Sequence, residues 1–434
     1  MKARLLVLMG LCLLPGLVQA DTNDSAYWPH WRGPNENGLV SQGNPPVVWS
    51  ENQNIRWKVA IPGLGHATPI VWGDRIYVQT AVQTEQAIAR ASEGNRRVPP
   101  YIFQFKVLAL DRKNGTTVWE KTVREIHPHQ GLHQTSSFAS TSGITDGKHL
   151  YAFFGSQGLY CFDLDGNLKW EKDLGDLNIK SSWGEGSSPT IYGNTMVINW
   201  DHQGQSFIVA LDKRTGKEIW RNERREGTSW STPLVIEHKG QHQVVVSASN
   251  RTRSYDLATG KLIWECGGLG SNVIPMPVYA NGIVYVTSGH RNPAIQAISL
   301  DKAKGDITDS DAVLWSIYGS DTPYVSSPLL YGDRLYFLKN RNGILSCYNA
   351  KTGEALFGPQ RLKGVRQVYA SLVGVNNRVY ISGLGGETMV IKNGPEFEVL
   401  ATNTIDEGIA ASPVVVGDAI YLRGDRHLYC IAED

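Results

Sequence analysis

The sequence contains few of the residues that build most reactive or highly charged sites. Five cysteines and five methionines occur in 434 residues, charged residues make up only 19%, and the formal net charge is +1. So small a net charge provides no electrostatic basis for binding nucleic acid. No His-Glu-x-x-His, P-loop, Gly-x-Ser-x-Gly or Cys-x-x-Cys-His motif occurs, so motifs indicate no zinc-protease, nucleotide, serine-hydrolase or covalent-haem site.

Long apolar runs are missing except at the N-terminus. A short basic start precedes the apolar stretch Leu5–Leu17, and small residues at the −3 and −1 positions predict a cut after Ala20. We therefore expect a signal peptide over residues 1–20, a periplasmic or secreted protein, and no transmembrane segment. Cys12 follows Leu11, a poor match to a lipoprotein cleavage box, which leaves a lipid anchor as the lesser alternative.

What the chain does contain is one pattern repeated about every 40–50 residues. A typical unit has an opening small residue and proline, two strands joined by a Gly-Asp or Gly-Asn turn, a third strand, an Asp-x-x-Thr-Gly turn, and a fourth strand with Trp four residues after that glycine. Ser142-Gly143 and Ser371-Leu372 are degenerate openers, Phe357 takes the place of the Trp in one unit, and an insertion displaces Trp315. The unit openers are Thr68-Pro69, Ser142-Gly143, Ser188-Pro189, Thr232-Pro233, Met276-Pro277, Ser327-Pro328, Ser371-Leu372 and Ser412-Pro413. Four short strands at this period are typical of a β-propeller, in which we expect the repeated Trp to pack between neighbouring blades.

The eighth unit is incomplete. Residues 409–434 supply only three strands, and the missing outer strand is available near the start of the chain, where Trp57 stands in for the repeated Trp. The sequence therefore predicts an all-β protein, a single eight-bladed β-propeller of four-stranded antiparallel blades over residues 54–434, closed by an N-terminal strand that completes the last blade. Residues 21–53 are expected to form an irregular arm over the rim. The insertion Gln83–Pro100 could form a lid that contains a short helix.

The repeats resemble the quinoprotein-dehydrogenase-like propeller family, whose members carry pyrroloquinoline-quinone (PQQ)-like repeats with a tryptophan docking motif. The chain is similar to secreted relatives of the outer-membrane assembly factor BamB within that family, and the run from Trp28 to Asn35 also resembles a group of bacterial propellers. The resemblance implies either a non-enzymatic scaffold of the cell envelope or a PQQ-dependent oxidoreductase. The adjacent cysteine pair that is typical of the alcohol-oxidising members is missing.

We interpret the repeated cysteines that follow the predicted cleavage site at Ala20 as packing residues. Cys161 and Cys347 precede the third turn of their units by two residues, and Cys430 holds the same place in the last unit. Equivalent positions in different blades should lie farther apart than the ~7 Å that a disulfide spans between Cα atoms. We expect these three to be free and buried, and Cys266 has no evident partner.

Aromatic and basic residues gather in the loops that should share one face of the ring. Such a depression suits an anionic or sugar-like ligand. The candidate ligand-binding residues are His66, Trp183, Glu185, Asp201, His202, Trp230, Arg251, Arg253, Arg291, Tyr324, Lys339, Arg341 and Tyr369. The histidines His127, His129 and His133 are candidate metal ligands, with an exposed polar loop as the alternative interpretation.

Three functions remain open from the sequence. The first is a non-enzymatic binding or assembly scaffold of the cell envelope, acting on a protein partner, with no cofactor and as a monomer. The second is a PQQ-dependent oxidoreductase with the quinone near Trp183 or Trp230 and calcium at Glu185 and Asp201. The third is a carbohydrate-active enzyme or binder that uses His66, the 127–133 loop and the arginines.

Overall fold

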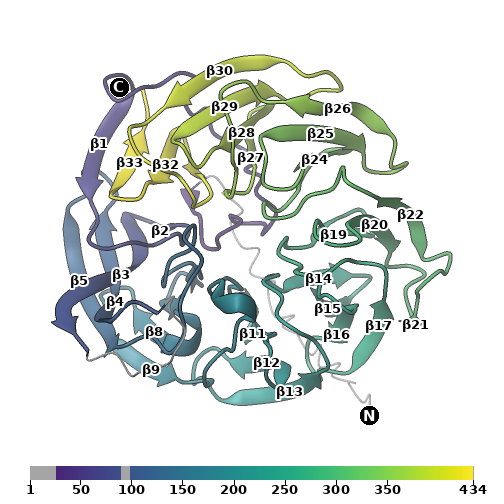
Figure 1. Ribbon diagram of the computed structural model, residues 1–434, viewed down its shortest axis with the longest axis horizontal. Helices are drawn as coiled ribbons and strands as arrows, with labels where there is room; N and C mark the ends of the chain where they lie inside the picture. The colour runs from purple at the N-terminus through teal and green to yellow at the C-terminus, as the bar shows by residue number, and fades with distance from the viewer. Residues whose placement is uncertain (1–25, 89–97, 434) are drawn as a thin grey trace, which may run out of the picture.

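The computed structural model describes residues 26–88 and 98–433, which form a ring of eight antiparallel blades (Figure 1). Each sheet has four strands, except the fourth, which has an added fifth. This confirms the predicted all-β, eight-bladed propeller. No helix in the described ranges is long and apolar enough to cross a membrane.

The blades are numbered by the order of their innermost strands along the chain, and each is given from the centre of the ring outward. Blade 1 contains β2 (Ile70–Trp72), β3 (Arg75–Ala87), β4 (Tyr101–Asp111) and β5 (Thr117–Ile126), and blade 2 contains β6 (Ile144–Thr145), β7 (His149–Phe153), β8 (Leu159–Asp163) and β9 (Leu168–Lys172). Blade 3 contains β10 (Thr190–Tyr192), β11 (Thr195–Trp200), β12 (Ser206–Asp212) and β13 (Glu218–Arg224). Blade 4 contains β14 (Leu234–His238), β15 (Gln241–Val246), β16 (Thr252–Asp256) and β17 (Leu262–Cys266), with β21 (Gly305–Asp306) added at its edge.

The second half of the ring follows the same plan. Blade 5 contains β18 (Val278–Ala280), β19 (Ile283–Ser288), β20 (Ala294–Ser299) and β22 (Val313–Tyr318), and blade 6 contains β23 (Leu329–Tyr331), β24 (Arg334–Leu338), β25 (Ile344–Asn349) and β26 (Ala355–Arg361). Blade 7 contains β27 (Val373–Val375), β28 (Arg378–Ser382), β29 (Glu387–Lys392) and β30 (Val399–Thr404). Blade 8 contains β31 (Val414–Val416), β32 (Ala419–Arg423) and β33 (His427–Ile431), completed by β1 (Ile55–Ala60).

The ring closes as the sequence predicts. Strand β1 pairs antiparallel with β33, from Ile55 opposite Ile431 to Ala60 opposite His427. In Figure 1 the purple β1 lies beside the yellow β33, so the two ends of the propeller share one sheet. Because the eighth blade gains its outer strand in this way, no incomplete sheet is left at the junction.

The repeated tryptophans lie between neighbouring blades. In five of them the indole N–H donates to a carbonyl in the third turn of the next blade, over 2.8 to 3.2 Å. These five are Trp57, Trp119, Trp170, Trp220 and Trp315. The glycine of that turn adopts a positive φ, and a Cβ there would lie within 3 Å of the indole ring. Trp264 differs, because its N–H donates to the side chain of Gln243 and β21 lies beside it, where the other blades have the turn.

A ring of hydroxyl groups joins the blades around the channel. The backbone N–H of an opening residue donates to the hydroxyl oxygen of the next opener over 2.9 to 3.1 Å, in the pairs Thr68–Ser142, Ser142–Ser188, Ser188–Thr232, Met276–Ser327, Ser327–Ser371 and Ser371–Ser412. These bonds explain why Ser or Thr recurs at the start of the units, because each hydroxyl supplies an acceptor to a buried backbone donor.

The arm departs from the expected path. Residues 44–49 contact blades 7 and 8, and residues 28–40 cross the base of the central channel. The backbone of Trp28 pairs with Val71 of blade 1, and the buried guanidinium of Arg32 donates to the carbonyls of Pro328 and Leu372 in blades 6 and 7. The purple arm is therefore seen inside the ring in Figure 1. A fully buried Trp and Arg explain this path, because the channel supplies the apolar surroundings and carbonyl partners that a rim does not.

The insertion in blade 1 also differs from expectation. Residues 83–87 continue strand β3 rather than forming a helix, and Gln83 pairs with Phe103 and Ala87 with Tyr101 on β4. Cross-strand pairing therefore outweighs the helical propensity of this Ala- and Gln-rich segment. Residues 89–97 of the expected lid lie outside the described residues.

Candidate ligand-binding site in the central channel

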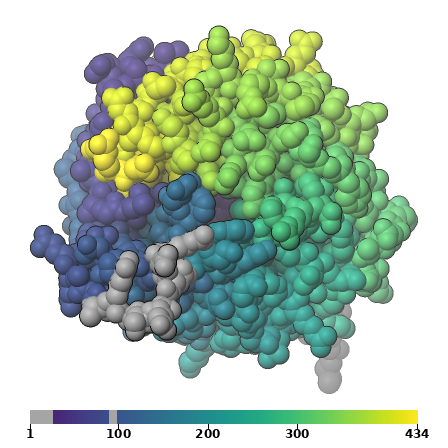
Figure 2. Space-filling view, viewed as in Figure 1, coloured from purple at the N-terminus to yellow at the C-terminus, as the bar shows by residue number. Residues whose placement is uncertain are grey.

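A cavity of about 570 Å³ opens at the centre of one face. Its wall is formed by the residues that lead into the innermost strands, including the ring hydroxyls of Thr68, Ser142, Ser188, Thr232, Ser327, Ser371 and Ser412. Figure 2 shows this face hollowed at the centre of the ring. The volume lies within the range of small-molecule sites in proteins.

Aromatic side chains form much of the wall. Trp183 and Trp230 are stacked with ring centroids 6.1 Å apart and planes inclined by 29°, and His290 and Tyr324 are stacked at 5.6 Å. The indole N–H of Trp230 donates to the carbonyl of Gly184 over 2.7 Å, which holds one loop against the next. These rings are fixed, flat apolar surfaces on which another ring can stack.

The arm also contributes to the cavity. Trp31 lines it, and because the neighbouring Trp28 and Arg32 hold the arm across the channel, the cavity is closed on that side. Trp31 was not among the candidate residues. The only sequence signal was the dense Trp-Pro-His-Trp-Arg-Gly-Pro run at 28–34, which matches no strand of the repeat.

One cation lies at the mouth of the cavity without a carboxylate partner. The Arg341 guanidinium donates to the Tyr369 hydroxyl over 3.3 Å, and that hydroxyl accepts a bond from Thr135, which is also bonded to His133. No carboxylate within the described ranges forms an ion pair with Arg341. The remaining N–H donors of Arg341 are available for a bound anion.

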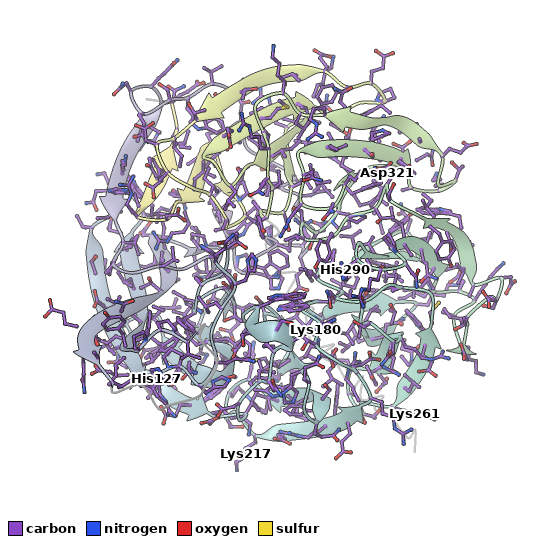
Figure 3. All side chains as sticks on the ribbon, in the orientation of Figure 1. His127, Lys180, Lys217, Lys261, His290 and Asp321 are labelled. Atoms are coloured by element: carbon purple, nitrogen blue, oxygen red, sulfur yellow. The ribbon has the colours of Figure 1, made fainter. Side chains whose placement is uncertain are left out.

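Lys180 lies close to the aromatic wall. Its ammonium is 5.9 Å from the centre of the Trp183 ring and donates to the side chain of Asn272 over 3.0 Å. Figure 3 shows Lys180 and His290 near the centre of the ring. A second positive charge is therefore close to the cavity.

Burial shifts the pKa values of His66, Glu185 and His290, which line the cavity. Burial, and then the charge of Arg423, lower the pKa of His66 to about 4, so its imidazole is neutral at pH 7. Burial raises the pKa of the Glu185 carboxyl, although its oxygens accept hydrogen bonds from the backbone and hydroxyl of Ser156. Burial also lowers the pKa of His290.

The structure brings together just over half of the candidate ligand-binding residues. The candidates that line the cavity are His66, Trp183, Glu185, Trp230, Tyr324, Arg341 and Tyr369. The candidates that lie outside the cavity wall are Asp201, His202, Arg251, Arg253, Arg291 and Lys339.

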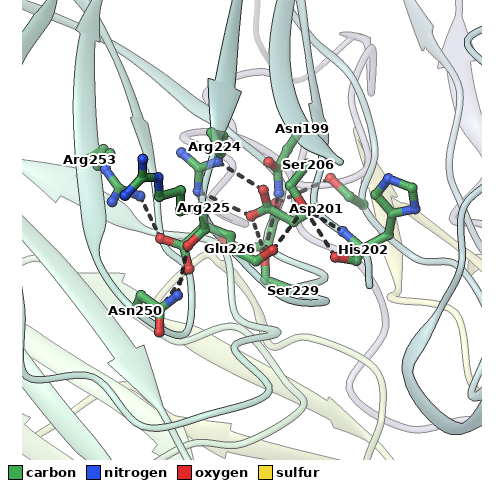
Figure 4. A network of polar contacts seen from close by, with 12 residues as sticks. Asn199, Asp201, His202, Ser206, Arg224, Arg225, Glu226, Ser229, Asn250 and Arg253 are labelled. Carbon is green, nitrogen blue, oxygen red and sulfur yellow. Dashed lines mark hydrogen bonds and ion pairs between the residues drawn. The ribbon is translucent and has the colours of Figure 1, made fainter. Parts of the chain in front are cut away.

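Several of the residues outside the cavity are engaged in ion pairs (Figure 4). The buried Asp201 carboxylate accepts bonds from Arg224 and Ser229. Arg253 pairs with Glu226 and Glu265. In the same blade, Arg251 pairs with Asp306 at 2.9 Å. These charges stabilise blades 3 and 4 and are not free to meet a ligand.

The three candidate metal histidines point to different partners. A ring nitrogen of His127 contacts the Pro99 carbonyl, and one of His129 contacts the Leu177 carbonyl. A ring nitrogen of His133 contacts the Thr135 hydroxyl. Within residues 26–88 and 98–433, no three His, Cys, Asp or Glu side chains are grouped as metal ligands would be.

The cysteines are as expected. Cys161, Cys347 and Cys430 are free and buried, and Cys266 is as well. The prediction of free thiols in the repeated packing position is confirmed.

Comparison with known proteins identifies relatives of this fold. The sequence profile of the family described as "Outer membrane protein assembly factor BamB" matches residues 32–176, 104–265 and 204–434. A curated relative of that name from Francisella salina is 28% identical over 103 residues, which are 23% of this chain and only 18% of that protein.

Solved structures share the fold at low identity. BamB from Moraxella catarrhalis matches with a TM-score of 0.51 and 13% identity over 82% of this chain and 98% of that one. Quinohemoprotein alcohol dehydrogenase from Comamonas testosteroni matches with a TM-score of 0.64 and 10% identity over 96% and 82%. Since the family profile spans nearly the whole ring, this chain belongs to the BamB family of PQQ-like β-propellers.

Proposed function

We propose that this protein is a non-catalytic binding protein of the cell envelope, and that its ligand occupies the central cavity. The observation that carries the proposal is a cavity of about 570 Å³, closed by the arm and lined by stacked aromatic rings, with an unpaired arginine at its mouth. The envelope location is supported by the name of the Francisella relative, an outer membrane protein assembly factor.

The lining residues support binding rather than catalysis. Glu185 is occupied by two bonds from Ser156, so it is not placed as a free general base. The Thr135 hydroxyl is bonded to His133 two residues before it, but the described part of the chain has no carboxylate that orients this imidazole. No nucleophile, base and orienting acid are therefore assembled around Thr135.

A quinone-dependent oxidoreductase is the alternative that the dehydrogenase-like fold raises. PQQ carries three carboxylates, and the calcium that accompanies it takes six to eight oxygen ligands. Glu185 is the one carboxylate among the described lining residues of the central cavity, and the Asp201 carboxylate, which is not among them, accepts bonds from Arg224 and Ser229. The wall of the central cavity therefore offers one carboxylate to a calcium ion, which disfavours a calcium-bound quinone there, and we derive no step through one.

A cavity-filling variant tests the proposal. Ala410 lines the cavity, and Ala410→Trp should place an indole inside it and reduce its volume, whereas Ala355→Trp places the same ring on the exposed strand β26. Thermal shift would be measured with D-glucuronate, D-glucose, benzoate, and PQQ with calcium. We expect at least one compound to stabilise the wild type and Ala355→Trp but not Ala410→Trp. Reduction of a redox dye by the wild type with PQQ, calcium and an alcohol would contradict the proposal.

A further inference from the structure

The hydroxyl ring presents hydrogen-bond donors to the cavity. Each oxygen of Ser142, Ser188, Thr232, Ser327, Ser371 and Ser412 accepts a backbone N–H, and within the described residues none of these hydroxyls donates to the protein. Since a hydroxyl has one hydrogen to donate, that hydrogen remains for a bound molecule. A wall of such donors favours a ligand rich in oxygen atoms.

The charge of the cavity favours an anion. Among residues 26–88 and 98–433, no carboxylate forms an ion pair with Arg341 or Lys180, whereas Glu185 is already bonded to Ser156. A guanidinium forms two parallel bonds with one carboxylate, which fixes the orientation of the ligand as well as its charge. Arg341 is exposed at the mouth, so a ligand reaches it without displacing another group.

The aromatic side chains of the cavity wall favour a ligand that contains a ring. The flat faces of Trp183, Trp230 and Tyr324 suit the C–H face of a sugar, whose hydroxyls project from the ring edge toward polar partners. A flat aromatic acid would stack equally well but would leave the wall hydroxyls without acceptors. A neutral sugar would leave Arg341 unpaired.

We propose that the ligand of the central cavity is a carboxylated sugar, a hexuronic acid or the terminal uronic acid of a saccharide. Its ring stacks on the tryptophan wall, its hydroxyls meet the hydroxyl ring, and its carboxylate binds Arg341. This inference rests on the proposed function and adds the class of ligand to it.

Calorimetric titration with D-glucuronate, D-glucose and benzoate tests the assignment. We expect glucuronate to bind with a Kd below about 1 mM, and glucose and benzoate at least about tenfold more weakly. Arg341→Gln should weaken glucuronate binding about tenfold to a hundredfold and leave glucose binding unchanged, because only the charged bond is lost. Arg361→Gln, on the exposed strand β26, is the matched control and should change neither.

Salt provides a second readout. Raising sodium chloride from about 0.05 to about 0.5 M should weaken glucuronate binding in the wild type and much less in Arg341→Gln. No binding of glucuronate, equal binding of glucose or benzoate, or an equal loss in Arg361→Gln would overturn the assignment. If Ala410→Trp abolishes binding of glucose or benzoate, the cavity remains the binding site although the ligand is not a sugar acid. PQQ-dependent dye reduction would instead overturn the proposed function itself.

Discussion

Trp57 lies opposite Cys430 in the shared last blade, and its indole N–H donates to the carbonyl of Arg112 in blade 1 over 3.2 Å. One residue near the start of the chain thus joins the final strand to the first blade. A Cβ at Gly115 would lie 2.9 Å from this ring, so the turn needs glycine here. The ring is closed by the same contact that joins its internal blades.

Trp57→Ala should destabilise the closure. The side chain is buried, and loss of a buried Trp costs about 3–5 kcal/mol of unfolding free energy. Chemical denaturation measures the change. Arg56→Ala, on the exposed side of the same strand, should stay within about 0.5 kcal/mol of the wild type. Equal effects of the two variants would contradict the role of Trp57.

Ser371→Ala should weaken the hydroxyl ring. The backbone N–H of Ser327 loses its acceptor in a buried position, which costs about 1–3 kcal/mol. Ser371→Thr keeps the hydroxyl and serves as the control, since threonine occupies this position in other blades. Denaturant midpoints compare the two, and a wild-type midpoint in Ser371→Ala would show that water replaces the bond.

Arg32→Met should loosen the arm. The carbonyls of Pro328, Leu372 and Asn37 would lose their donor, and an unpaired buried acceptor costs about 1–3 kcal/mol. Limited proteolysis followed by mass spectrometry should show new cuts within residues 28–40. Arg75→Met, at a partly exposed site of blade 1, should leave the arm protected. An arm that stays resistant in Arg32→Met would mean that its backbone bonds to the blades, such as those of Trp28 with Val71 and Val40 with Gly374, are enough to hold it.

Stability should fall as the pH is lowered from about 6.5 towards 4. The pKa of His66 is about 4 in the folded protein against an ordinary value of 6.5, so in this range the unfolded chain takes up a proton that the folded chain does not. Stability present above pH 6.5 is therefore lost on acidification.

His66→Asn tests this relation. Between pH 6.5 and 4.5 the variant should lose about 2–3 kcal/mol less than the wild type in denaturant titrations. His127→Asn, in a half-buried loop position, is the control. Parallel pH profiles of wild type and His66→Asn would contradict the assignment.

The thiols should react only after unfolding. Burial raises the pKa of Cys161 and Cys347 to about 12 and of Cys266 and Cys430 to about 11. Because the thiolate is the reactive form, a disulfide reagent at pH 8 should modify no thiol in the folded chain that lacks residues 1–20. All four should react in guanidinium. Fast modification without denaturant would show that a packing position is open to solvent.

The sequence predicted the fold because its determinants are local and repeated. Most units encode their own turns, glycine and Trp, so eight copies could be counted and the missing outer strand of the eighth could be assigned to the segment around Trp57. The sequence also predicted which face of the ring carries several of the lining residues. Examples are His66, Trp183, Trp230 and Tyr369, which precede innermost strands and line the cavity.

The composition of the site depended on partners from different blades. The sequence predicts similar positions for Arg251, Arg253 and Arg341 near the second turn of their units. In the structure the first two form ion pairs with carboxylates, and no carboxylate of the described residues pairs with Arg341. The path of the arm was likewise hidden, since residues 28–40 have no strand pattern and their carbonyl partners lie some 300 residues away. By itself the sequence determined the ring and its closure, because local turn chemistry and packing repeat in every unit. Only the tertiary structure decided which charges remain unpaired and what closes the channel, because both depend on side chains that meet only after the ring has formed.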